Sequence, residues 1–296
     1  MLLKRGSACT GLAFRRQQRP IHKPPSDSDH FRARPVKQSV SAAAADSKRT
    51  AVVSGTGTFN GIGRACVREF LKQGYVVVGL DMNPPEDVEA DEVLQQFQGS
   101  HHFLEVDVSE EASVKNAVGA ARQFFGDQVH CVVNNAGLAI PSMPDDPAEK
   151  VAAFRKFLAV NLEGAFILAE ACIPFMPARQ SSIIHISSIR SKFAEPNTEG
   201  YTSSKAGMLG LTRAQAVSLD KKVRVNTVMP GYIDTPGSAG EITQDQHDWH
   251  LVGRAGHPQD IAHAVVFLAD EEKAGFIDGC ELMIDGGVSA KLVYPD

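Results

Sequence analysis

The sequence predicts an α/β fold, a doubly wound parallel sheet of seven strands, on two observations. Seven short runs rich in β-branched and other apolar residues recur along residues 50–296, and each has the length of a strand rather than of a buried helix. Longer segments whose apolar residues repeat at helical spacing lie between these runs. Strands that are apolar on both faces belong to parallel sheets covered by helices on each side. Right-handed crossovers then give a single Rossmann-type domain.

The expected elements alternate in order along the chain. The strands cover residues 50–53, 75–80, 102–106, 129–133, 182–186, 223–228 and 281–284. The crossover helices cover 62–72, 112–125, 148–171, 201–219 and 258–269. The sequence shows no internal repeat, so we expect one domain over 50–296.

The composition favours a globular protein with a small-molecule partner. Of the 296 residues, 43% are apolar and 22% are charged, which excludes a disordered or fibrous chain. The net charge of −5 is unevenly spread: residues 1–49 hold 11 Lys and Arg against 3 Asp and Glu, a charge of +8, so the remainder carries −13. Because an acidic body repels phosphate backbones, we expect no nucleic acid among the partners.

Residues 1–49 are expected to form a flexible leader. They show no sustained period and contain Pro20, Pro24, Pro25 and Pro35, a composition typical of linkers. The first 23 residues hold six basic and no acidic residues, as mitochondrial and plastid transit peptides do. The leader is either such a transit peptide or a tail without an address. We expect a cytoplasmic protein unless the leader directs it to an organelle.

Cysteine usage and hydropathy exclude other classes. No cysteine forms a C-x-x-C pair or has a histidine at metal-ligand spacing, so we expect reduced, buried thiols, no metal site and an intracellular compartment. The most apolar stretch, residues 157–175, is interrupted by Glu163 and Glu170, so we expect no membrane-spanning segment. The cysteines are Cys9, Cys66, Cys131, Cys172 and Cys280.

A glycine-rich turn follows the first expected strand. The run from Ser54 to Arg64 reads SGTGTFNGIGR and leads directly into a helix. Glycines at such a turn allow a tight bend, let backbone N–H groups approach a pyrophosphate, and place the phosphates at the positive helix N-terminus. Either Gly55 or Gly57 is the turn glycine. The expected nucleotide-binding residues here are Gly55, Gly57, Asn60, Gly61, Ile62 and Gly63.

Asp81 follows the second expected strand, 18 residues after Gly63. At this spacing a carboxylate reaches the adenosine ribose and accepts hydrogen bonds from its hydroxyls. The same charge repels a 2′-phosphate, and no Arg or Lys immediately follows to receive one. The sequence therefore predicts NAD rather than NADP. The alternative is that Asp81 only opens the turn at residues 83–85.

Three polar residues have the spacing of a catalytic group. Ser188 lies 13 residues before Tyr201, and Lys205 lies four residues after it. Residues four apart on a helix share one face, so the Lys205 ammonium is expected near the Tyr201 phenol. The motif Gly-x-Ser-x-Gly is absent from the sequence, which argues against a Ser-His-Asp hydrolase.

With these motifs the chain closely resembles the classical short-chain dehydrogenase/reductase family, from about residue 51 to residue 287. The family's glycine motif matches residues 56–63, although strand register would place Ser54 and Gly55 at its first two positions and so imply a two-residue insertion. The remaining matches are Asp107 and Val108 at the adenine pocket, Asn134, Asn135, Ala136 and Gly137 after the fourth strand, Asn161 on a helix, and Pro230, Gly231 and Thr235 after the sixth strand.

The resemblance implies a role for each catalytic residue. Tyr201 would be the general base for alcohol oxidation or the general acid for carbonyl reduction, and Ser188 would hydrogen-bond the substrate oxygen. Lys205 would also hold the nicotinamide ribose, and Asn161 would support a water in the proton path. A lysine ammonium about 4 Å away favours the phenolate by about 4 kcal/mol at an effective dielectric near 20, or about three pKa units. Desolvation opposes that effect, and an oxidised nicotinamide supports it.

The resemblance also implies a substrate loop and an assembly. Residues 235–256 match the loop by position, and their Asp, His and Gln content disfavours a large apolar substrate. Trp249, the only tryptophan, forms either an aromatic wall over the substrate or part of a subunit contact. The family's usual tetramer implies a homotetramer or homodimer.

The expected function is hydride transfer between NAD(H) and a secondary alcohol or ketone, such as a sugar or a small polar alcohol. Two alternatives remain. One is a 3-oxoacyl-type carbonyl reductase, which would normally use NADP and therefore disagrees with Asp81. The other is a catalytically silent nucleotide-binding protein of the same fold.

Overall fold

The computed structural model describes residues 48–138, 143–236 and 242–291. Asp46–Asp296 forms one compact unit. The leader expected over residues 1–49 lies outside the described residues, apart from its last two, and so does Cys9.

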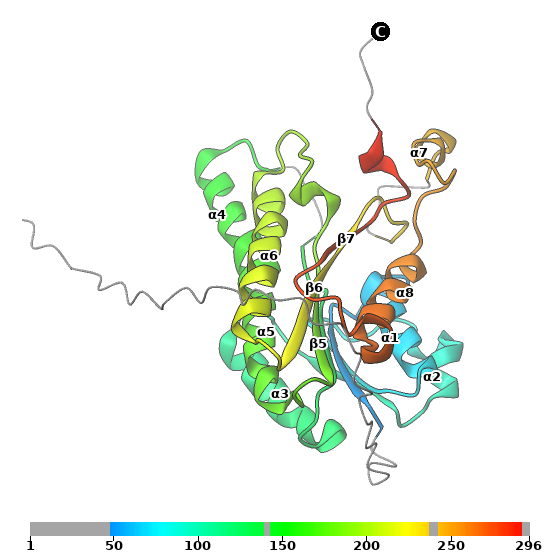
Figure 1. The fold of residues 1–296 in the computed structure, drawn as a ribbon. Coiled ribbons are helices and arrows are strands. Elements are labelled where there is room, and N and C mark those ends of the chain that lie inside the picture. The colour runs from blue at the N-terminus through cyan, green and yellow to red at the C-terminus, as the bar shows by residue number, and fades with distance from the viewer. Residues whose placement is uncertain (1–47, 139–142, 237–241, 292–296) are drawn as a thin grey trace, which may run out of the picture. The chain divides into compact units, whose positions relative to one another are not determined.

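Seven parallel strands form one sheet in the order β3-β2-β1-β4-β5-β6-β7 (Figure 1). The register places Val52 of β1 opposite Val78 of β2 and Val132 of β4. The predicted fold class is confirmed, and no strand end differs from its predicted position by more than two residues. The strands are β1 (Thr50–Ser54), β2 (Val76–Asp81), β3 (His101–Glu105), β4 (Cys131–Asn134), β5 (Ser181–Ile186), β6 (Val223–Pro230) and β7 (Glu281–Ile284).

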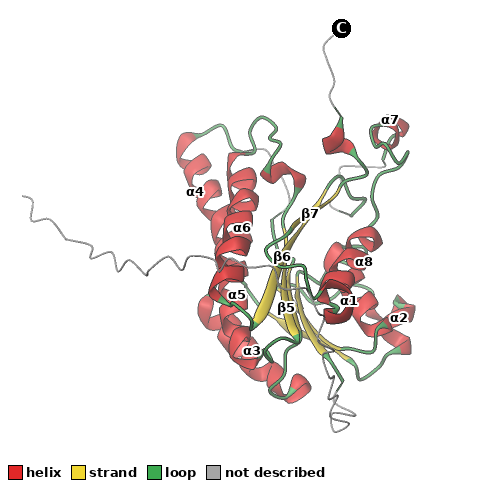
Figure 2. Cartoon of the chain, in the orientation of Figure 1, coloured by secondary structure: helices red, strands yellow, loops and turns green. Residues whose placement is uncertain are grey.

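Helices cover both faces of the sheet (Figure 2). One face carries α1 (Ile62–Lys72), α2 (Glu92–Gln96) and α8 (Pro258–Ala269), and the other carries α3 (Glu111–Phe125), α4 (Pro147–Leu158), α5 (Gly164–Cys172) and α6 (Glu199–Ser218). The helix expected over 148–171 is present, and a π-helical turn, Ala159–Glu163, lies within it between α4 and α5. The short helices α2, α7 (Gln244–Asp248) and α9 (Glu271–Ala274) are too short to show a helical period in the sequence.

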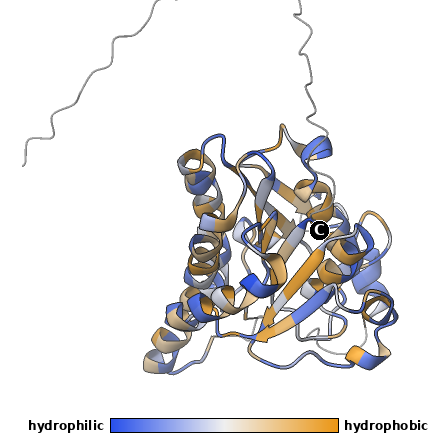
Figure 3. Ribbon diagram, turned by 90° about the horizontal axis from the view of Figure 1, so that it is seen from below, coloured by the Kyte–Doolittle hydropathy of each residue, from blue (hydrophilic) through white to orange (hydrophobic). Residues whose placement is uncertain are grey.

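Two apolar layers join the helices to the sheet. Successive residues of a strand point to opposite faces, so Val53 packs with Phe70 and Leu71 of α1, whereas Val52 packs with Val118 of α3. All of them are buried. Figure 3 shows hydrophobic strands at the centre and helices of mixed character around them. Truncating a large side chain such as Phe70 to alanine would cost about 3–5 kcal/mol of stability.

Three of the four described cysteines are buried, and one of these three lies in the most apolar helical stretch. Cys66, Cys131 and Cys172 are buried free thiols whose pKa values burial raises, but Cys280 is only half-buried, contrary to expectation. Among the described residues, one helical stretch, Pro147–Phe175, would be long and apolar enough to cross a membrane, a property that core helices share. Its Cys172 packs in the layer between α3 and the sheet.

The carboxyl ends of the parallel strands meet at one edge of the sheet and position the site. The chain runs outward from β1 to β3 on one side and from β4 to β7 on the other. Ligands of open α/β sheets bind in the crevice at such a reversal, here between the loops after β1 and β4. The Asn135 side-chain amide joins these two loops, donating to the carbonyls of Ser54 at 2.9 Å and Gly55 at 3.0 Å.

Candidate active site

The turn after β1 depends on Gly55. Its φ is +74°, and its N–H donates to the Leu80 carbonyl at 2.7 Å. A Cβ at this position would lie 2.6 Å from the Asn135 amide nitrogen and 2.8 Å from the Ala136 Cα. Gly55, not Gly57, is therefore the turn glycine, and the loop from Gly55 to Gly61 has the two extra residues that the strand register implied.

Helix α1 begins at the end of this loop, and its N-terminus has no side-chain cap within the part of the chain that the structure describes. Gly61 is the N-cap in an extended conformation, and no side chain among the described residues caps it. The first-turn N–H groups of an α-helix have no partner within the helix, so those of Ile62 and Gly63 are available to an anion. Asn60 lies in the turn just before the cap. This arrangement fits a phosphate group.

Asp81 contacts the loop as well as facing the crevice. Its Oδ2 accepts the Gly57 N–H at 2.8 Å and its Oδ1 accepts the Asn83 N–H at 3.0 Å. Each carboxylate oxygen has two acceptor sites, so one site on each oxygen remains for a ribose hydroxyl. The contact with Gly57 was not foreseen from the sequence.

The residues expected at the adenine end lie after β3. Asp107 accepts hydrogen bonds at Oδ1 from the Ser109 N–H at 2.9 Å and from its hydroxyl at 2.6 Å, which fixes the start of the turn into α3. Val108 is buried. It packs against Gly164, the first residue of α5.

The segment after β4 connects the nucleotide end to the catalytic end. The backbone N–H groups of Asn135 and Ala136 donate to the Ser54 hydroxyl at 3.1 and 3.0 Å. The Asn134 side chain lies 3.2 Å from His185 Nδ1 inside the sheet. A Cβ on Gly137 would lie 3.2 Å from Asn161 Oδ1 and 3.4 Å from Lys205 Nζ, so a glycine here lets the loop pass between them.

Asn161 is held by backbone and side-chain contacts on the π-helical turn. Its Oδ1 accepts the Leu138 N–H at 2.7 Å, and its Nδ2 donates to the Ser204 hydroxyl at 3.1 Å. The extra residue of a π-helical turn rotates Asn161 relative to a regular helix, and such turns are common at functional sites. Asn161 is fully buried.

Ser188, Tyr201 and Lys205 line one cavity of about 970 Å³. Lys205 Nζ lies 5.7 Å from the centre of the Tyr201 ring and donates to the Ile186 carbonyl at 2.8 Å. The Ser188 hydroxyl oxygen accepts the Arg190 N–H at 3.2 Å, and the same hydroxyl is hydrogen-bonded to Tyr201. Pro230, Gly231 and Thr235 line the same cavity, as do Ile62, Asn135 and Gly137.

Burial controls the charges of this group. It lowers the pKa of Lys205 to about 8. It raises the pKa of Tyr201, and the hydrogen bond with Ser188 and the positive charge of Arg190 only partly oppose it. In the protein alone the Tyr201 pKa is thus raised overall, because desolvation of the phenolate outweighs the favourable contacts with Ser188 and Arg190.

Lys205→Met is expected to stabilise the protein at pH 7 by about 2 kcal/mol. A folded-state pKa near 8 instead of 10.5 means that burying the ammonium costs about 3 kcal/mol below pH 8, offset by about 1 kcal/mol for the lost hydrogen bond. As the pH rises from 8 to 10.5, the Lys205 amine loses its proton in the folded protein before it does so in the unfolded chain. The stability of the wild type therefore increases relative to that of the variant. Urea unfolding at pH 7 and pH 10 measures both; a variant less stable at pH 7 would contradict the burial cost.

The upper wall of the cavity contains residues that the motifs did not identify. Trp249 and Phe193, both partly exposed, line it together with Tyr232, Gln246 and Arg190. Trp249 packs edge-on against His250, with ring centres 5.3 Å apart. Gln246 and Trp249 lie in the loop expected over residues 235–256, whereas Phe193, Tyr232 and Arg190 were not identified from the sequence. Among the described residues, no cluster of His, Cys, Asp and Glu has the arrangement of a metal site.

Known proteins share the sequence of most of this chain. The family model described as Enoyl-(Acyl carrier protein) reductase matches residues 55–289. An uncharacterised oxidoreductase of Thermotoga maritima is 37% identical, covering 84% of this chain and 98% of its own. Cis-4-hydroxycyclohexanecarboxylate dehydrogenase of Sinomonas cyclohexanicum is 34% identical, covering 82% and 97%. L-fucose dehydrogenase of Mus musculus is also 34% identical, covering 82% and 89%.

A solved structure shares the fold over a similar length. An apo SCOR enzyme from Clostridium thermocellum superposes with a TM-score of 0.71 at 29% identity, covering 84% of this chain and 96% of that chain.

Proposed function

The chain belongs to the classical short-chain dehydrogenase/reductase family and is an oxidoreductase acting on CH–OH groups, and we propose that this protein oxidises a cyclic secondary alcohol with NAD. One observation carries the proposal. Ser188, Tyr201 and Lys205, which come from two different segments, line one cavity, and Asn161 lies beside Lys205 across Gly137.

Each residue has a task that its contacts support. The Ser188 hydroxyl has one proton to donate to the substrate oxygen, and the Arg190 N–H occupies only one of its two acceptor sites. Tyr201 accepts the alcohol proton at its phenolic oxygen. Lys205 has used one of three N–H donors on Ile186, so the remaining two can hold a ribose hydroxyl and a water. Asn161, fixed by Leu138 and Ser204, supports that water.

The residues at the crevice fit a dinucleotide. The uncapped first turn of α1 would receive the pyrophosphate, and Asp81, with its remaining acceptor sites, would bind the adenosine ribose. Asp107 and Val108 would border the adenine, and Asn134 to Gly137 with Pro230, Gly231 and Thr235 would line the path to the nicotinamide. When bound, NAD would supply the acceptor for the hydride of the carbinol carbon.

The cavity suits a ring of modest size. Its wall offers the aromatic faces of Trp249 and Phe193, while Tyr232 and Gln246 supply polar groups beside them. Apolar ring carbons and a few hydroxyls match such a mixed wall. Relatives named for a hydroxycyclohexane carboxylate and for L-fucose support a cyclic alcohol of either kind.

The test is a panel of secondary alcohols and their ketones assayed with NAD(H) and NADP(H) by coenzyme absorbance. Cyclohexanol derivatives and hexoses form two arms, and acyclic alcohols and 3-oxoacyl thioesters form the controls. We expect turnover with NAD on a cyclic arm. Preferred reduction of 3-oxoacyl thioesters with NADPH would instead identify a 3-oxoacyl-type reductase.

We also propose that the protein is a homotetramer or a homodimer. Phe166 on α5 and Val217 on α6 are exposed apolar residues on helices that cover one face of the sheet, and a subunit partner would bury them. Analytical ultracentrifugation at micromolar concentration is expected to show an assembly. Substituting Val217 by lysine should shift it towards smaller species, whereas a monomeric wild type would refute the proposal.

For the cell, we propose a cytoplasmic protein unless residues 1–49 act as a transit peptide. Their basic, acid-free start supports an address in mitochondria or plastids. A fluorescent protein fused behind residues 1–49 is expected to reach an organelle if the address is real, and a fusion with its six N-terminal basic residues changed to glutamine serves as control. Equal diffuse fluorescence of both fusions would leave the cytoplasm as the location.

A further inference from the structure

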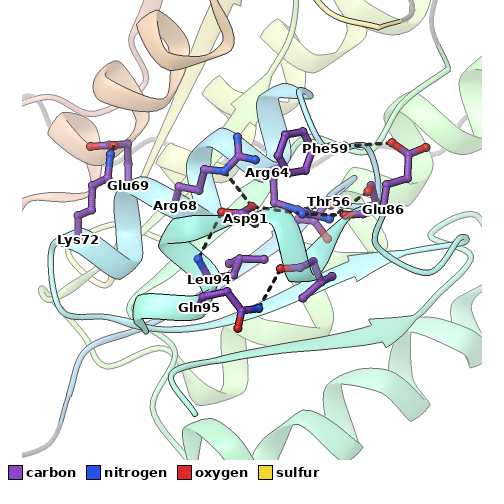
Figure 4. Close-up of polar contacts among 12 residues, drawn as sticks. Thr56, Phe59, Arg64, Arg68, Glu69, Lys72, Glu86, Asp91, Leu94 and Gln95 are labelled. Atoms are coloured by element: carbon purple, nitrogen blue, oxygen red, sulfur yellow. Dashed lines mark hydrogen bonds and ion pairs between the residues drawn. The ribbon is translucent and has the colours of Figure 1, made fainter. Parts of the chain in front are cut away.

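Arg64 is a fully buried charged residue that the proposed mechanism does not use. It lies on α1, directly after Gly63, and its guanidinium points under the loop that follows β1 (Figure 4). Its Nε donates to the Thr56 carbonyl at 3.1 Å, and its Nη2 donates to the Gly57 carbonyl at 3.1 Å. Thr56 and Gly57 belong to the loop that is two residues longer than the family's motif.

The guanidinium also binds the segment after β2. Its Nη1 donates to the Glu86 carbonyl at 3.2 Å and to Asp91 Oδ2 at 3.3 Å. Glu86 returns two contacts to the loop: its N–H donates to the Gly57 carbonyl at 2.9 Å, and its carboxylate accepts the Phe59 N–H at 3.2 Å. One side chain therefore fixes two stretches of backbone against each other.

Asp91 holds Arg64 in place from the other side. It is buried, accepts a second ion pair from Arg68 Nε at 2.9 Å, and caps α2 through the Leu94 N–H at 3.3 Å. Arg64 also stacks over the Phe103 ring at 5.2 Å. A buried ion pair brings little net stability because desolvation offsets the attraction. The ion pair does fix the position of the Arg64 guanidinium before a ligand binds, and this favours a positioning role for Arg64.

The contacts lead directly to Asp81. Gly57 has its carbonyl bound by Arg64 and by Glu86, and its N–H then donates to Asp81 Oδ2 at 2.8 Å. A Cβ on Gly57 would lie 3.0 Å from the Asp81 Cγ, so loop and carboxylate pack closely. A shift of Gly57 would therefore move the Asp81 carboxylate.

We propose that Arg64 is a positioning residue for the coenzyme: through Thr56 and Gly57 it fixes the lengthened phosphate loop and the Asp81 carboxylate, and so sets affinity and preference for NAD. The inference rests on the proposed function. Arg64 does not line the cavity that holds Ser188, Tyr201 and Lys205, so its effect falls on coenzyme binding rather than on proton transfer.

The experiment compares the full-length wild type with Arg64→Met and Arg64→Lys. NADH and NADPH dissociation constants come from fluorescence titration, which requires no substrate, and KM for NAD and kcat come from the alcohol found in the panel. Val118→Ala, in the core layer on the opposite face of the sheet, is the control for lost stability without contact to the loop. If Arg64→Met does not fold, Arg64→Met combined with Asp91→Asn removes both buried charges.

We expect Arg64→Met to weaken NADH binding by about tenfold or more, the effect of losing a charge-assisted hydrogen bond, and to reduce the NADH over NADPH preference. Its kcat at saturating NAD should stay close to that of the wild type. Arg64→Lys should recover part of the affinity. The inference would be overturned if Arg64→Met bound NADH as tightly as the wild type. It would also be overturned if Arg64→Met lost no more NADH affinity than Val118→Ala when the two variants have the same Tm. A wild type that binds neither coenzyme would overturn the proposed function and the inference together.

Discussion

Tyr201→Phe is expected to lower kcat for alcohol oxidation by about 10²- to 10⁴-fold, the usual contribution of a general acid–base group. Only a hydroxyl is removed, and the phenyl ring keeps its edge-to-face packing on Phe157, with ring centres 6.3 Å apart. NADH binding should therefore remain close to that of the wild type. Fluorescence titration measures binding, and steady-state kinetics measure the loss.

The pH profile gives a second readout of the same substitution. Burial raises the pKa of Tyr201, and oxidation needs the deprotonated phenol, so wild-type kcat/KM should rise with pH. Tyr201→Phe should lose that dependence. Phe157→Leu, which changes the packing but keeps the hydroxyl, is the matched control. Near-normal kcat in Tyr201→Phe would remove the catalytic assignment.

Asp81→Ala is expected to abolish most of a preference for NAD over NADP of roughly 10²-fold. In the wild type the carboxylate accepts hydrogen bonds from ribose hydroxyls, whereas a 2′-phosphate would meet a like charge, a juxtaposition that costs several kcal/mol. Each 1.4 kcal/mol is about tenfold in the ratio of kcat/KM values. The variant should bind NAD more weakly and lose the repulsion of NADP, without becoming specific for NADP, because no Arg or Lys immediately follows Asp81.

Asp81→Asn separates charge from loop support. Its amide oxygen can still accept the Gly57 N–H, which in the wild type lies 2.8 Å from Oδ2, but the negative charge is gone. We expect Asp81→Asn to tolerate NADP better than the wild type and to bind NAD more tightly than Asp81→Ala. A wild type that used both coenzymes equally would mean that Asp81 serves only the loop and the turn.

The strands and long helices could be predicted because their patterns are local. The run Val76–Asp81 is apolar on both faces, as a central parallel strand must be, and α1 and α8 have the predicted bounds. The π-helical turn at Asn161 could not be predicted, because the same apolar spacing is compatible with a regular α-helix, which differs only in its backbone hydrogen bonds. It is this turn that brings Asn161 to Leu138 and Ser204.

The sequence identified which residues form the site, but it could not predict the contacts between them. Spacing brought Tyr201 and Lys205 to one helix face, yet the balance between burial and charge at Tyr201 depends on the packing of the whole cavity. From the sequence alone, Arg64 is an ordinary polar residue in the first turn of a helix. Only the fold shows that three backbone carbonyls and Asp91 surround its guanidinium.

A single-turnover measurement shows whether the protein transfers a hydride from an alcohol to NAD. Enzyme in excess over NAD is mixed with the preferred alcohol carrying deuterium on the carbinol carbon, and the products are quantified by absorbance and mass spectrometry. We expect one deuterated NADH and one ketone for each NAD, and no transfer on the same timescale with Tyr201→Phe. Tight binding of NAD without any deuterium transfer would contradict it and would identify a nucleotide-binding protein that has kept the fold without the reaction.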